Sequence, residues 1–523
     1  SIVDRNGDEL AISVPVETVW ADPKIIMDNN ALAMTEHWQA LADVLGKDVN
    51  KLTTKVVRSP TKRFVYLERK ISPAMAKYIR ELKIPGIHLR KESKRFYPTG
   101  EISAHIVGFT NVDDKGIEGV ERVYDELLTG KGGNKRFRKD AKGRKVEILS
   151  EDVAEQAKDI TLSIDQRIQA IAYKELKGAV KAFKATSGSI VVTNVHTGEI
   201  LAMTNSPSYN PNNRRNTAIH RFRNRAITDF YEPGSTMKPL TVLSALEFGN
   251  VKANSVVDTS PGRMRLGGRR VSDPRNYGKL SLTDILVHSS NMGTTKLALS
   301  LPKEFYLDKF FEAGFGEDTG TGLIGESFGI MHDRQRWSKI ELATLSYGMG
   351  LAATPLQLAR FYSTLANGGI KKTLSILKVD KNTVVPSERV FTEKHSNDVV
   401  EMLEHVVDEH YKVARVDGYR VGGKTGTSFK AFAGGYGNDY VGLFAGIAPI
   451  TNPEIVVVVV INEPGGDLYH GGEVAAPVFS RVMKGALQVL NITPDAREDL
   501  ALSNALIEAE VEIIASNEEA NDA

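Results

Sequence analysis

The first 155 residues combine short strand-like runs with loops rich in glycine and charged residues. Apolar side chains at every second position from Ile12 to Val16 predict an early strand. Residues 56–57 and 64–66 also predict strands, and residues 73–82, which begin with proline, predict a helix. The amino-terminal part of the chain therefore predicts a small α+β module.

From residue 160 the pattern changes to longer helices between strands. Apolar residues at helical spacing predict a helix over 163–180, and a strand, a turn and a strand follow over 189–203. Further helical patterns cover residues 237–247, 282–299, 340–366, 396–408 and 475–489. Strand-like runs return over residues 420–428, 440–447 and 455–462. Strands at both ends of a helical segment predict an α/β domain whose antiparallel sheet is closed by its terminal pieces.

These changes in pattern divide the chain into residues 1–155, 156–494 and 495–523. Residues 130–145 are rich in glycine and basic side chains and predict a solvated hairpin or loop. A phosphate-binding loop is disfavoured there because no apolar helical run follows the glycines. The last part is acidic, with Arg497 as its single basic residue, and we expect a flexible tail.

Composition narrows the possible functions. The 523 residues carry a formal net charge of +2, so no overall field draws the chain to nucleic acid or to an anionic membrane. Cysteine is absent, which excludes disulfides, thiolate metal sites and cysteine nucleophiles. The longest aliphatic run, Ile455 to Ile461, is far shorter than the roughly 20 residues that span a bilayer. Because the chain opens at Ser1 with strand-like alternation soon after, we expect an upstream segment, such as a membrane anchor, to be missing.

The first string that carries chemistry is Ser235-Thr236-Met237-Lys238. The pattern S-x-x-K occurs three more times, so the surroundings must decide its meaning. A Pro-Gly turn precedes Ser235, and Pro239 fits only the first turn of the apolar helix that follows. Ser235 then lies at a helix N-terminus, which favours a developing anion, and Lys238 lies within reach of its hydroxyl. A buried lysine has a lowered pKa and can accept the serine proton.

Two further strings add candidate residues. Ser289-Ser290-Asn291 follows a helical run, and we expect it on a connection where a hydroxyl can relay a proton and an amide can hold a carbonyl. Lys424-Thr425-Gly426 lies on a predicted strand and offers a cation for a carboxylate.

On that strand, alternation places Lys424, Gly426 and Ser428 on one face and the two threonines, Thr425 and Thr427, on the other. Gly426 would let a substrate backbone approach closely, and the edge of such a strand can pair with an extended peptide.

Together the strings S-x-x-K, S-x-N and K-T-G, in this order, are the set found in penicillin-binding proteins and serine β-lactamases. Longer stretches resemble the class B penicillin-binding proteins, above all the septal transpeptidases of Gram-negative cell division. These stretches are residues 3–11 and 95–133 for the amino-terminal module, and 203–213, 336–341, 346–369 and 476–483 for the transpeptidase domain.

The resemblance implies a multidomain α/β (α+β) chain with the penicillin-binding, serine transpeptidase fold. Residues 156–494 would form an antiparallel sheet sandwiched by helices. Residues 1–155 would form an elongated, non-catalytic α+β module of the dimerisation or pedestal type.

By the same resemblance, Ser235 attacks the penultimate D-Ala carbonyl of a peptidoglycan stem peptide, and Lys238 is the general base. Ser289 and Asn291 would relay protons and hold the peptide amide. Lys424, Thr425, Gly426 and Thr427 would form the substrate-binding strand, and backbone N–H groups of Ser235 and Thr427 would form the oxyanion hole. An amine from a second stem peptide resolves the acyl-enzyme. No cofactor or metal is expected, because the histidines show no ligand spacing.

The resemblance also implies partners and a location. The expected ligands are stem peptides and β-lactams, and the expected protein partners are a membrane glycosyltransferase of the SEDS type and other division proteins. The expected location is the periplasmic face of the inner membrane at the division site, with the anchor absent from this chain.

The same residues support other functions less well. A serine β-lactamase shares the three strings but has no use for a module of about 150 residues. A D,D-carboxypeptidase is chemically close, and some hydrolysis stays open. A bifunctional enzyme would need a larger amino-terminal domain, and a scaffold without activity would not need all three strings. Nucleic-acid binding by the arginine-rich residues 214–225 is disfavoured, because no interleaved aromatic pattern or recognised motif is present.

Overall fold

The computed structural model describes residues 1–130, 135–139, 145–151, 155–432 and 435–496. It forms two compact units. Unit 1 comprises residues 1–2, 9–98 and 107–159, and unit 2 comprises residues 3–8, 99–106 and those from 160 onward. Over the described residues, no helix combines the length and the apolar character required to cross a membrane.

Unit 1 is built on the long strand β2 (Glu9–Ala21), which pairs antiparallel with β3 (Val65–Ile71) and β4 (Ile87–Phe96). The predicted early strand is thus confirmed. Helices α1 (Pro23–Asp28), α2 (Thr35–Leu45), α3 (Val49–Val57) and α4 (Pro73–Glu81) accompany the sheet. Their apolar faces meet the strands in one core that includes Val19, Trp38, Leu52, Leu67 and Ile79.

The strand predicted at residues 56–57 is wrong, because both valines end helix α3. Asp48 caps this helix by accepting hydrogen bonds from the backbone N–H groups of Asn50 and Lys51. Leu52 and Val56, four residues apart, lie on its buried face. A strong cap and helical spacing here outweigh the strand preference of two adjacent β-branched residues.

The rest of unit 1 consists of short elements. They are β5 (Phe109–Thr110), β6 (Gly116–Glu118), α6 (Gly119–Val123), α7 (Asp125–Thr129), β7 (Lys135–Lys139) and β8 (Lys145–Glu151). β7 and β8 pair antiparallel, so the hairpin predicted within residues 130–145 is present where the structure describes it. Residues 131–134 and 140–144 of that prediction, and residues 497–523 of the acidic tail, lie outside the described residues.

Unit 2 contains an antiparallel sheet with the order β11-β10-β20-β19-β18. The strands are β10 (Ser187–Asn194), β11 (Ile200–Ser206), β18 (Gly422–Phe432), β19 (Gly435–Ala448) and β20 (Ile455–Asn462). The sheet thus joins a hairpin from the start of the domain (β10 and β11) to three strands from its end (β18, β19 and β20), as predicted. β18 lies at the edge of this sheet, so one side of its backbone has no neighbouring strand.

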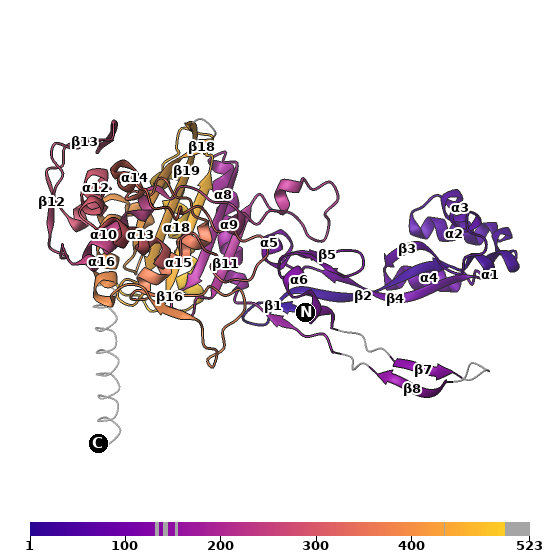
Figure 1. The fold of residues 1–523 in the computed structure, drawn as a ribbon. Helices are drawn as coiled ribbons and strands as arrows, with labels where there is room; N and C mark the ends of the chain where they lie inside the picture. The colour runs from indigo at the N-terminus through magenta and orange to yellow at the C-terminus, as the bar shows by residue number, and fades with distance from the viewer. Residues whose placement is uncertain (131–134, 140–144, 152–154, 433–434, 497–523) are drawn as a thin grey trace, which may run out of the picture. The chain divides into compact units, whose positions relative to one another are not determined.

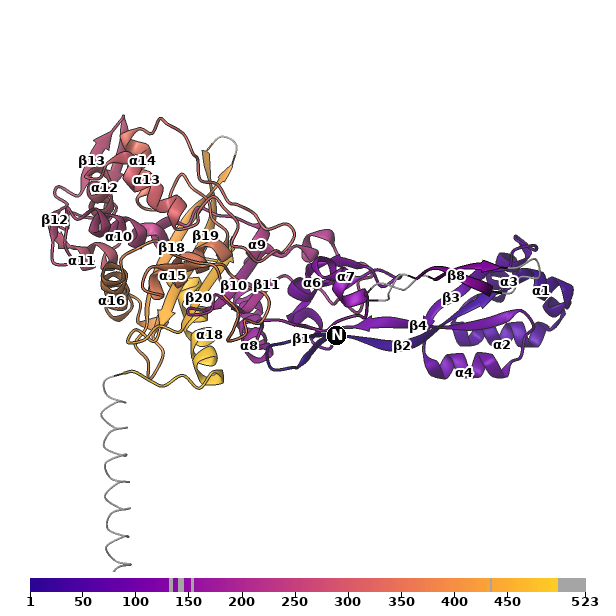
Figure 2. The ribbon, with the colours of Figure 1, turned by 60° about the horizontal axis from the view of Figure 1, so that its bottom comes forward.

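Helices cover both faces of this sheet (Figures 1 and 2). α8 (Gln166–Ala182) and α18 (Ala476–Val489) pack on one face, where Leu176, Val457 and Phe479 share a buried core. α15 (Pro355–Ala366) packs against β10, β19 and β20 on the other face. Coverage on both sides explains why β20 is buried at every position and reads as a continuous apolar run. The predicted fold class is confirmed.

A helical region beside β18 carries the remaining long helices. They are α10 (Lys238–Phe248), α11 (Leu282–Val287), α12 (Asn291–Leu299), α13 (Lys303–Glu312), α14 (Lys339–Leu345) and α16 (Glu393–His410). Short helices are α5 (Ala104–Val107), α9 (Arg225–Thr228) and α17 (Gly471–Val474). Short strands are β1 (Ile2–Val3), β9 (Ile160–Thr161), β12 (Val256–Asp258), β13 (Arg263–Leu266), β14 (Arg269–Ser272), β15 (Lys279–Ser281), β16 (Ile370–Lys372) and β17 (Ser387–Arg389).

Two segments predicted as continuous helices are each divided in two. Residues 282–299 break after α11, because Ser289 has a left-handed backbone and Ser290 caps α12 by accepting from the N–H of Gly293. Residues 340–366 break between α14 and α15, where Gly348 has a positive φ and Thr354 begins a capping box. Both breaks place loops beside the strings singled out from the sequence.

Candidate active site

Ser235 lies on a single 3-10 turn (Gly234–Met237) that leads directly into α10. Pro239 is the second residue of α10, the position that the sequence requires for it. The turn is held from inside: the Thr236 hydroxyl donates to the carbonyl of Pro233 at 2.7 Å, and the Tyr362 hydroxyl donates to the carbonyl of Thr236 at 2.8 Å. Ser235 is therefore presented at the start of a buried helix.

A glycine that the sequence analysis did not single out fixes this turn from the other side. The N–H of Gly234 donates to the carbonyl of Gly348 at 3.0 Å, and both glycines have positive φ. A Cβ added at Gly348 would stand 1.9 Å from the carbonyl oxygen of Gly234. The two backbones thus touch where no side chain fits. The sequence shows Gly348 within the glycine pair of SYGMG. The segment that it contacts, at Gly234, lies far away along the chain, so no local pattern reveals the contact.

Lys238 is almost fully buried, with 1% of its surface exposed. Its ammonium donates to the carbonyl oxygen of Ser289 at 2.6 Å and to the Ser289 hydroxyl at 2.8 Å. Among the hydrogen bonds of the described residues, none joins Lys238 to Ser235, and the amine contacts Ser289 instead. Burial lowers the pKa of Lys238 well below its usual value, and the nearby Lys424 charge lowers it further.

Ser289 lies on the turn between α11 and α12, as predicted, with φ near +54°. Its hydroxyl receives hydrogen bonds from two lysines, Lys238 at 2.8 Å and Lys424 at 3.1 Å. Asn291 is the first residue of α12 rather than part of the connection, and its amide donates to the carbonyl of Ser272 at 3.4 Å. The structure therefore brings the three strings together around one hydroxyl group.

Asp273 is a further residue of this site that sequence reasoning missed. Its carboxylate is 8% exposed and accepts from the Ser290 hydroxyl at 2.5 Å and from the N–H of Met292 at 3.1 Å. It holds the turn that carries Ser289, and its charge raises the pKa of Lys238 against the effect of burial. The sequence gives no sign of this role, because Asp273 belongs to no motif and its burial depends on tertiary packing.

Lys424 lies on the edge strand β18 and is fully buried. Burial lowers its pKa to about 7. The registers along this strand are continuous from Gly422 to Phe429, and the irregularity lies between Phe429 and Ala431. The strand therefore has no bulge at Gly426, and the predicted alternation of faces is confirmed.

The face of β18 that carries Lys424 meets the nucleophile turn. A Cβ at Gly426 would lie 2.7 Å from the carbonyl oxygen of Pro233 and 2.9 Å from Cγ2 of Thr236. The Ser428 hydroxyl donates to the carbonyl of Glu232 at 2.6 Å. Glycine is required at position 426 because the protein's own turn approaches there, a reason different from the substrate approach expected from the sequence.

The opposite face of β18 opens into a pocket of about 490 Å³, here named the Thr425 pocket. Thr425 and Thr427 line it together with His410, Tyr411 and His470. The Thr427 hydroxyl accepts from the N–H of Gly471 at 2.9 Å. The pocket's hydroxyl groups, its imidazoles and Lys412 can bind an anionic group, while Glu409 and Glu473 add negative charge to the same lining.

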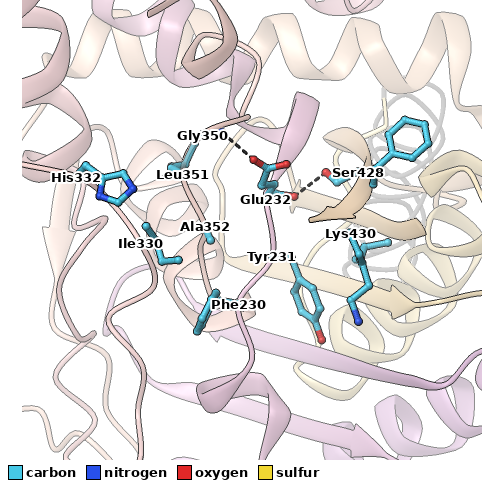
Figure 3. A pocket seen from close by; sticks show the side chains of 12 residues that line it. Phe230, Tyr231, Glu232, Ile330, His332, Gly350, Leu351, Ala352, Ser428 and Lys430 are labelled. Carbon is cyan, nitrogen blue, oxygen red and sulfur yellow. Dashed lines mark hydrogen bonds between the residues drawn. The ribbon is translucent and has the colours of Figure 1, made fainter. Parts of the chain in front are cut away.

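A second cavity of about 350 Å³, here named the Glu232 pocket, lies beside the nucleophile turn. Figure 3 shows its lining, with Phe230, Ile330 and Leu351 as apolar members and the Glu232 carboxylate accepting from the N–H of Gly350 at 2.9 Å. The Ser428 contact to Glu232 joins this wall to β18. The cavity combines an apolar surface with a carboxylate close in sequence to Ser235.

The arrangement joins a serine, a buried amine with a lowered pKa, a bridging hydroxyl and an adjacent pocket suited to an anion. These are the parts needed for acyl transfer through a serine ester. Within the ranges that the structure describes, no group of three or more histidine, aspartate or glutamate side chains is placed to hold a metal ion.

Comparison with known proteins identifies the family. A family model described as the penicillin binding protein transpeptidase domain matches residues 188–484, and one described as the penicillin-binding protein dimerisation domain matches residues 1–162. The chain belongs to the class B penicillin-binding proteins. This penicillin-binding protein is thus a transpeptidase, as its three strings predict.

Relatives and solved structures agree with this assignment. Peptidoglycan D,D-transpeptidase FtsI of Escherichia coli strain K12 is 48% identical over 498 residues, which cover 95% of this chain and 84% of that protein. The probable peptidoglycan D,D-transpeptidase PenA of Neisseria gonorrhoeae is 38% identical over 501 residues, or 94% and 85% of the two chains. A peptidoglycan synthetase structure from Bifidobacterium adolescentis matches with a TM-score of 0.75 and 26% identity over 95% and 96% of the two chains.

The first prediction concerns the cost of burying Lys424. Its pKa is about 7 in the folded protein against 10.5 in a free chain, so between these values the unfolded state binds more protons and wild-type stability rises with pH. We expect Lys424→Met to have a higher thermal midpoint than wild type at pH 7. The lost hydrogen bond to Ser289, worth about 1 kcal/mol, offsets only part of this gain.

Thermal unfolding of wild type and Lys424→Met from pH 6 to 11 measures this difference, which should shrink as pH rises and change sign above about pH 10.5, where only the lost hydrogen bond remains. The exposed Lys381 provides the control, since Lys381→Met removes the same charge from solvent and should leave the midpoint unchanged. A Lys424→Met midpoint equal to or below wild type at pH 7 would contradict the prediction.

Proposed function

We propose that this penicillin-binding protein cross-links peptidoglycan stem peptides through an acyl-enzyme on Ser235. The observation that carries the proposal is the convergence of Lys238 and Lys424 on the Ser289 hydroxyl, beside the turn that presents Ser235. The β-lactams, which imitate the D-Ala-D-Ala end of the stem peptide, are the corresponding covalent inhibitors.

In the first half-reaction, the Ser235 hydroxyl attacks the carbonyl carbon of the penultimate D-Ala, and its proton passes to the neutral amine of Lys238. Burial lowers the pKa of Lys238 and so favours the neutral amine that accepts this proton. The bond between the two D-Ala residues then breaks, an ester forms on Ser235, and the leaving amine takes a proton from Lys238 through the Ser289 hydroxyl. Terminal D-Ala leaves the site.

In the second half-reaction, a side-chain amine of another stem peptide attacks the ester carbonyl. An amide bond forms, the ester bond to Ser235 breaks, and the surplus proton of the amine returns to Ser235 by way of Lys238. Because Lys238 acts first as base and then as acid, a pKa lowered from that of an ordinary lysine serves both steps.

Binding of the donor peptide is assigned to β18. Thr425 and Thr427, whose hydroxyl groups face the Thr425 pocket, would hold the terminal carboxylate. Lys424, on the opposite face of the strand, would contribute its positive charge across the strand rather than by direct contact. The backbone N–H groups of Ser235 and Thr427 would receive the carbonyl oxygen during attack, and Asn291 would hold the peptide amide.

The Glu232 pocket would receive the earlier residues of the same donor peptide. An extended peptide that pairs antiparallel with β18 and ends near Thr425 advances about 3.3 Å per residue. Its residues two or three positions before the cleaved bond then lie beside Ser428 and Lys430, which line this pocket. The apolar wall and the Glu232 carboxylate suit a stem peptide that bears a diamino acid.

The cellular setting follows from this substrate. We place the reaction on the periplasmic side of the inner membrane at the division site, because peptidoglycan is assembled outside that membrane. The 48% identity to FtsI supports a septal role. A membrane glycosyltransferase of the SEDS type that supplies glycan strands, together with other division proteins, is the expected set of partners.

Replacement of the nucleophile tests the proposed function directly. After brief exposure to a penicillin, intact-protein mass spectrometry should show one drug adduct on wild type that persists for many minutes, and none on Ser235→Ala. The variant Ser428→Ala, which alters the neighbouring strand but leaves the nucleophile in place, should still form the adduct. An adduct that disappears rapidly with release of hydrolysed drug would instead indicate a β-lactamase, and an adduct on Ser235→Ala would refute Ser235 as the nucleophile.

A second test uses the charge of Asp273. Asp273→Asn keeps a group that can accept from Met292 N–H but removes the charge that raises the pKa of Lys238. The pKa of Lys238 then falls, so the acid limb of the acylation rate, below which Lys238 is protonated, should move to lower pH. Stopped-flow acylation by a chromogenic penicillin from pH 4 to 9 measures this limb.

Asp273→Ala also removes the hydrogen bonds that hold the Ser289 turn, and we expect acylation at pH 7 to slow by roughly ten- to a hundredfold. Asp308→Asn, at an exposed position on α13, should leave both rate and profile unchanged. An acid limb that stays in place or moves to higher pH in Asp273→Asn would contradict the assigned role of this charge.

A further inference from the structure

A small hairpin next to the active site carries an arginine surface that the transpeptidase reaction as described does not use. β13 and β14 pair in register, with Met264 opposite Val271 and Arg265 opposite Arg270. A two-residue turn of glycines at 267 and 268, both with positive φ, closes the hairpin. Figure 1 shows β13 beside α12 and α14.

One face of this hairpin is fixed to the helical region. Val271 belongs to a small core with Met292 of α12 and Ala343 of α14, and Met264 and Leu266 pack against the same core. The register places these apolar residues on a common face. The hairpin of residues 263–272, here named the arginine hairpin, is thus held against the helices rather than standing as a free loop.

The other face presents Arg263, Arg265 and Arg270, which are all exposed. Arg265 and Arg270 stand directly opposite each other, an arrangement of like charges that destabilises a strand pair. Over the residues that the structure describes, none of the three forms an ion pair that would offset this repulsion. Three guanidinium groups on one rigid face are therefore available to an anion outside the chain.

The same hairpin leads directly into the active site. Ser272, the last residue of β14, accepts the hydrogen bond from the Asn291 amide, and Asp273 accepts from Ser290. Arg270 is two residues before Ser272, which corresponds to about 7 Å along a strand. An anion bound by the three arginines would lie next to the turn that carries Ser289.

We propose that the face formed by Arg263, Arg265 and Arg270 binds carboxylates of the acceptor stem peptide, the one whose amine attacks the acyl-enzyme. This inference rests on the proposed function and adds an acceptor subsite to it. The donor carboxylate is already assigned to the Thr425 pocket, on β18, whereas the acceptor brings carboxylates of its own. Guanidinium groups pair with carboxylates in bidentate fashion, which suits a peptide that must be oriented as well as attracted.

A matched pair of acceptors tests the subsite. With a thioester donor that ends in D-Ala, the acceptors are a synthetic stem tetrapeptide with free carboxylates and the same peptide with its carboxylates amidated. For wild type we expect a lower KM for the carboxylate form. In the triple variant Arg263→Gln, Arg265→Gln, Arg270→Gln, the KM for that form should rise roughly three- to thirtyfold, and the KM for the amidated form should stay unchanged.

Two controls separate charge from structure. The variant Lys181→Gln, Lys381→Gln, Lys484→Gln removes three exposed positive charges elsewhere on unit 2 and should keep the wild-type KM. The rate of Ser235 acylation by a penicillin should be equal in wild type and in the arginine variant, because acylation needs no acceptor.

Each other outcome overturns the inference. An unchanged acceptor KM in the arginine variant would show that the arginine hairpin is a solvated surface that binds no acceptor. Loss of penicillin acylation in that variant would give the hairpin a structural role. An unchanged KM with lost binding to phosphatidylglycerol vesicles would assign the arginines to anionic lipid. Failure of wild type itself to join donor and acceptor, with penicillin acylation intact, would refute the proposed cross-linking as well.

Discussion

The site depends on one unusual electrostatic arrangement: two buried lysines share a single serine hydroxyl. Burial makes the charged form of each amine costly and lowers the pKa of both, and the Lys424 charge lowers the pKa of Lys238 further. Asp273 opposes part of this effect by placing one carboxylate behind the turn that carries Ser289. The balance of these three charges gives amines that release protons more readily than ordinary lysines, which suits proton exchange with a serine nucleophile.

That balance exists only because three distant parts of the chain are held at close range. The nucleophile turn, the turn between α11 and α12, and the edge strand β18 are separated by large stretches of sequence. Two close contacts, which leave no room for a side chain, hold the nucleophile turn in place. Gly348 lies against the turn on one side, and Gly426 of β18 lies against it on the other. The sheet, packed between α15 and the pair α8 and α18, provides the rigid base for these contacts. The packing energy of the whole domain therefore offsets the cost of removing water from the two lysines.

The edge position of β18 gives the site two sides with different chemistry. Lys424, Gly426 and Ser428 face the nucleophile turn, whereas the two threonines face a pocket with imidazoles. One strand can thus separate proton transfer from anion binding while it pairs with an extended peptide along its open side. The arginine hairpin, formed by β13 and β14, extends the same site beside the turn that carries Ser289.

The sequence by itself determined the order of strands and helices in unit 2, the three motif strings, and the alternation of faces along β18. These features depend on local periodicity and residue type, which neighbouring residues carry. Only the tertiary structure decided that the Lys238 ammonium contacts Ser289, that Asp273 is buried beside it, and that two predicted helices are interrupted. Each depends on burial or on a contact between segments far apart in the chain, and no local pattern records which surfaces will lose their water.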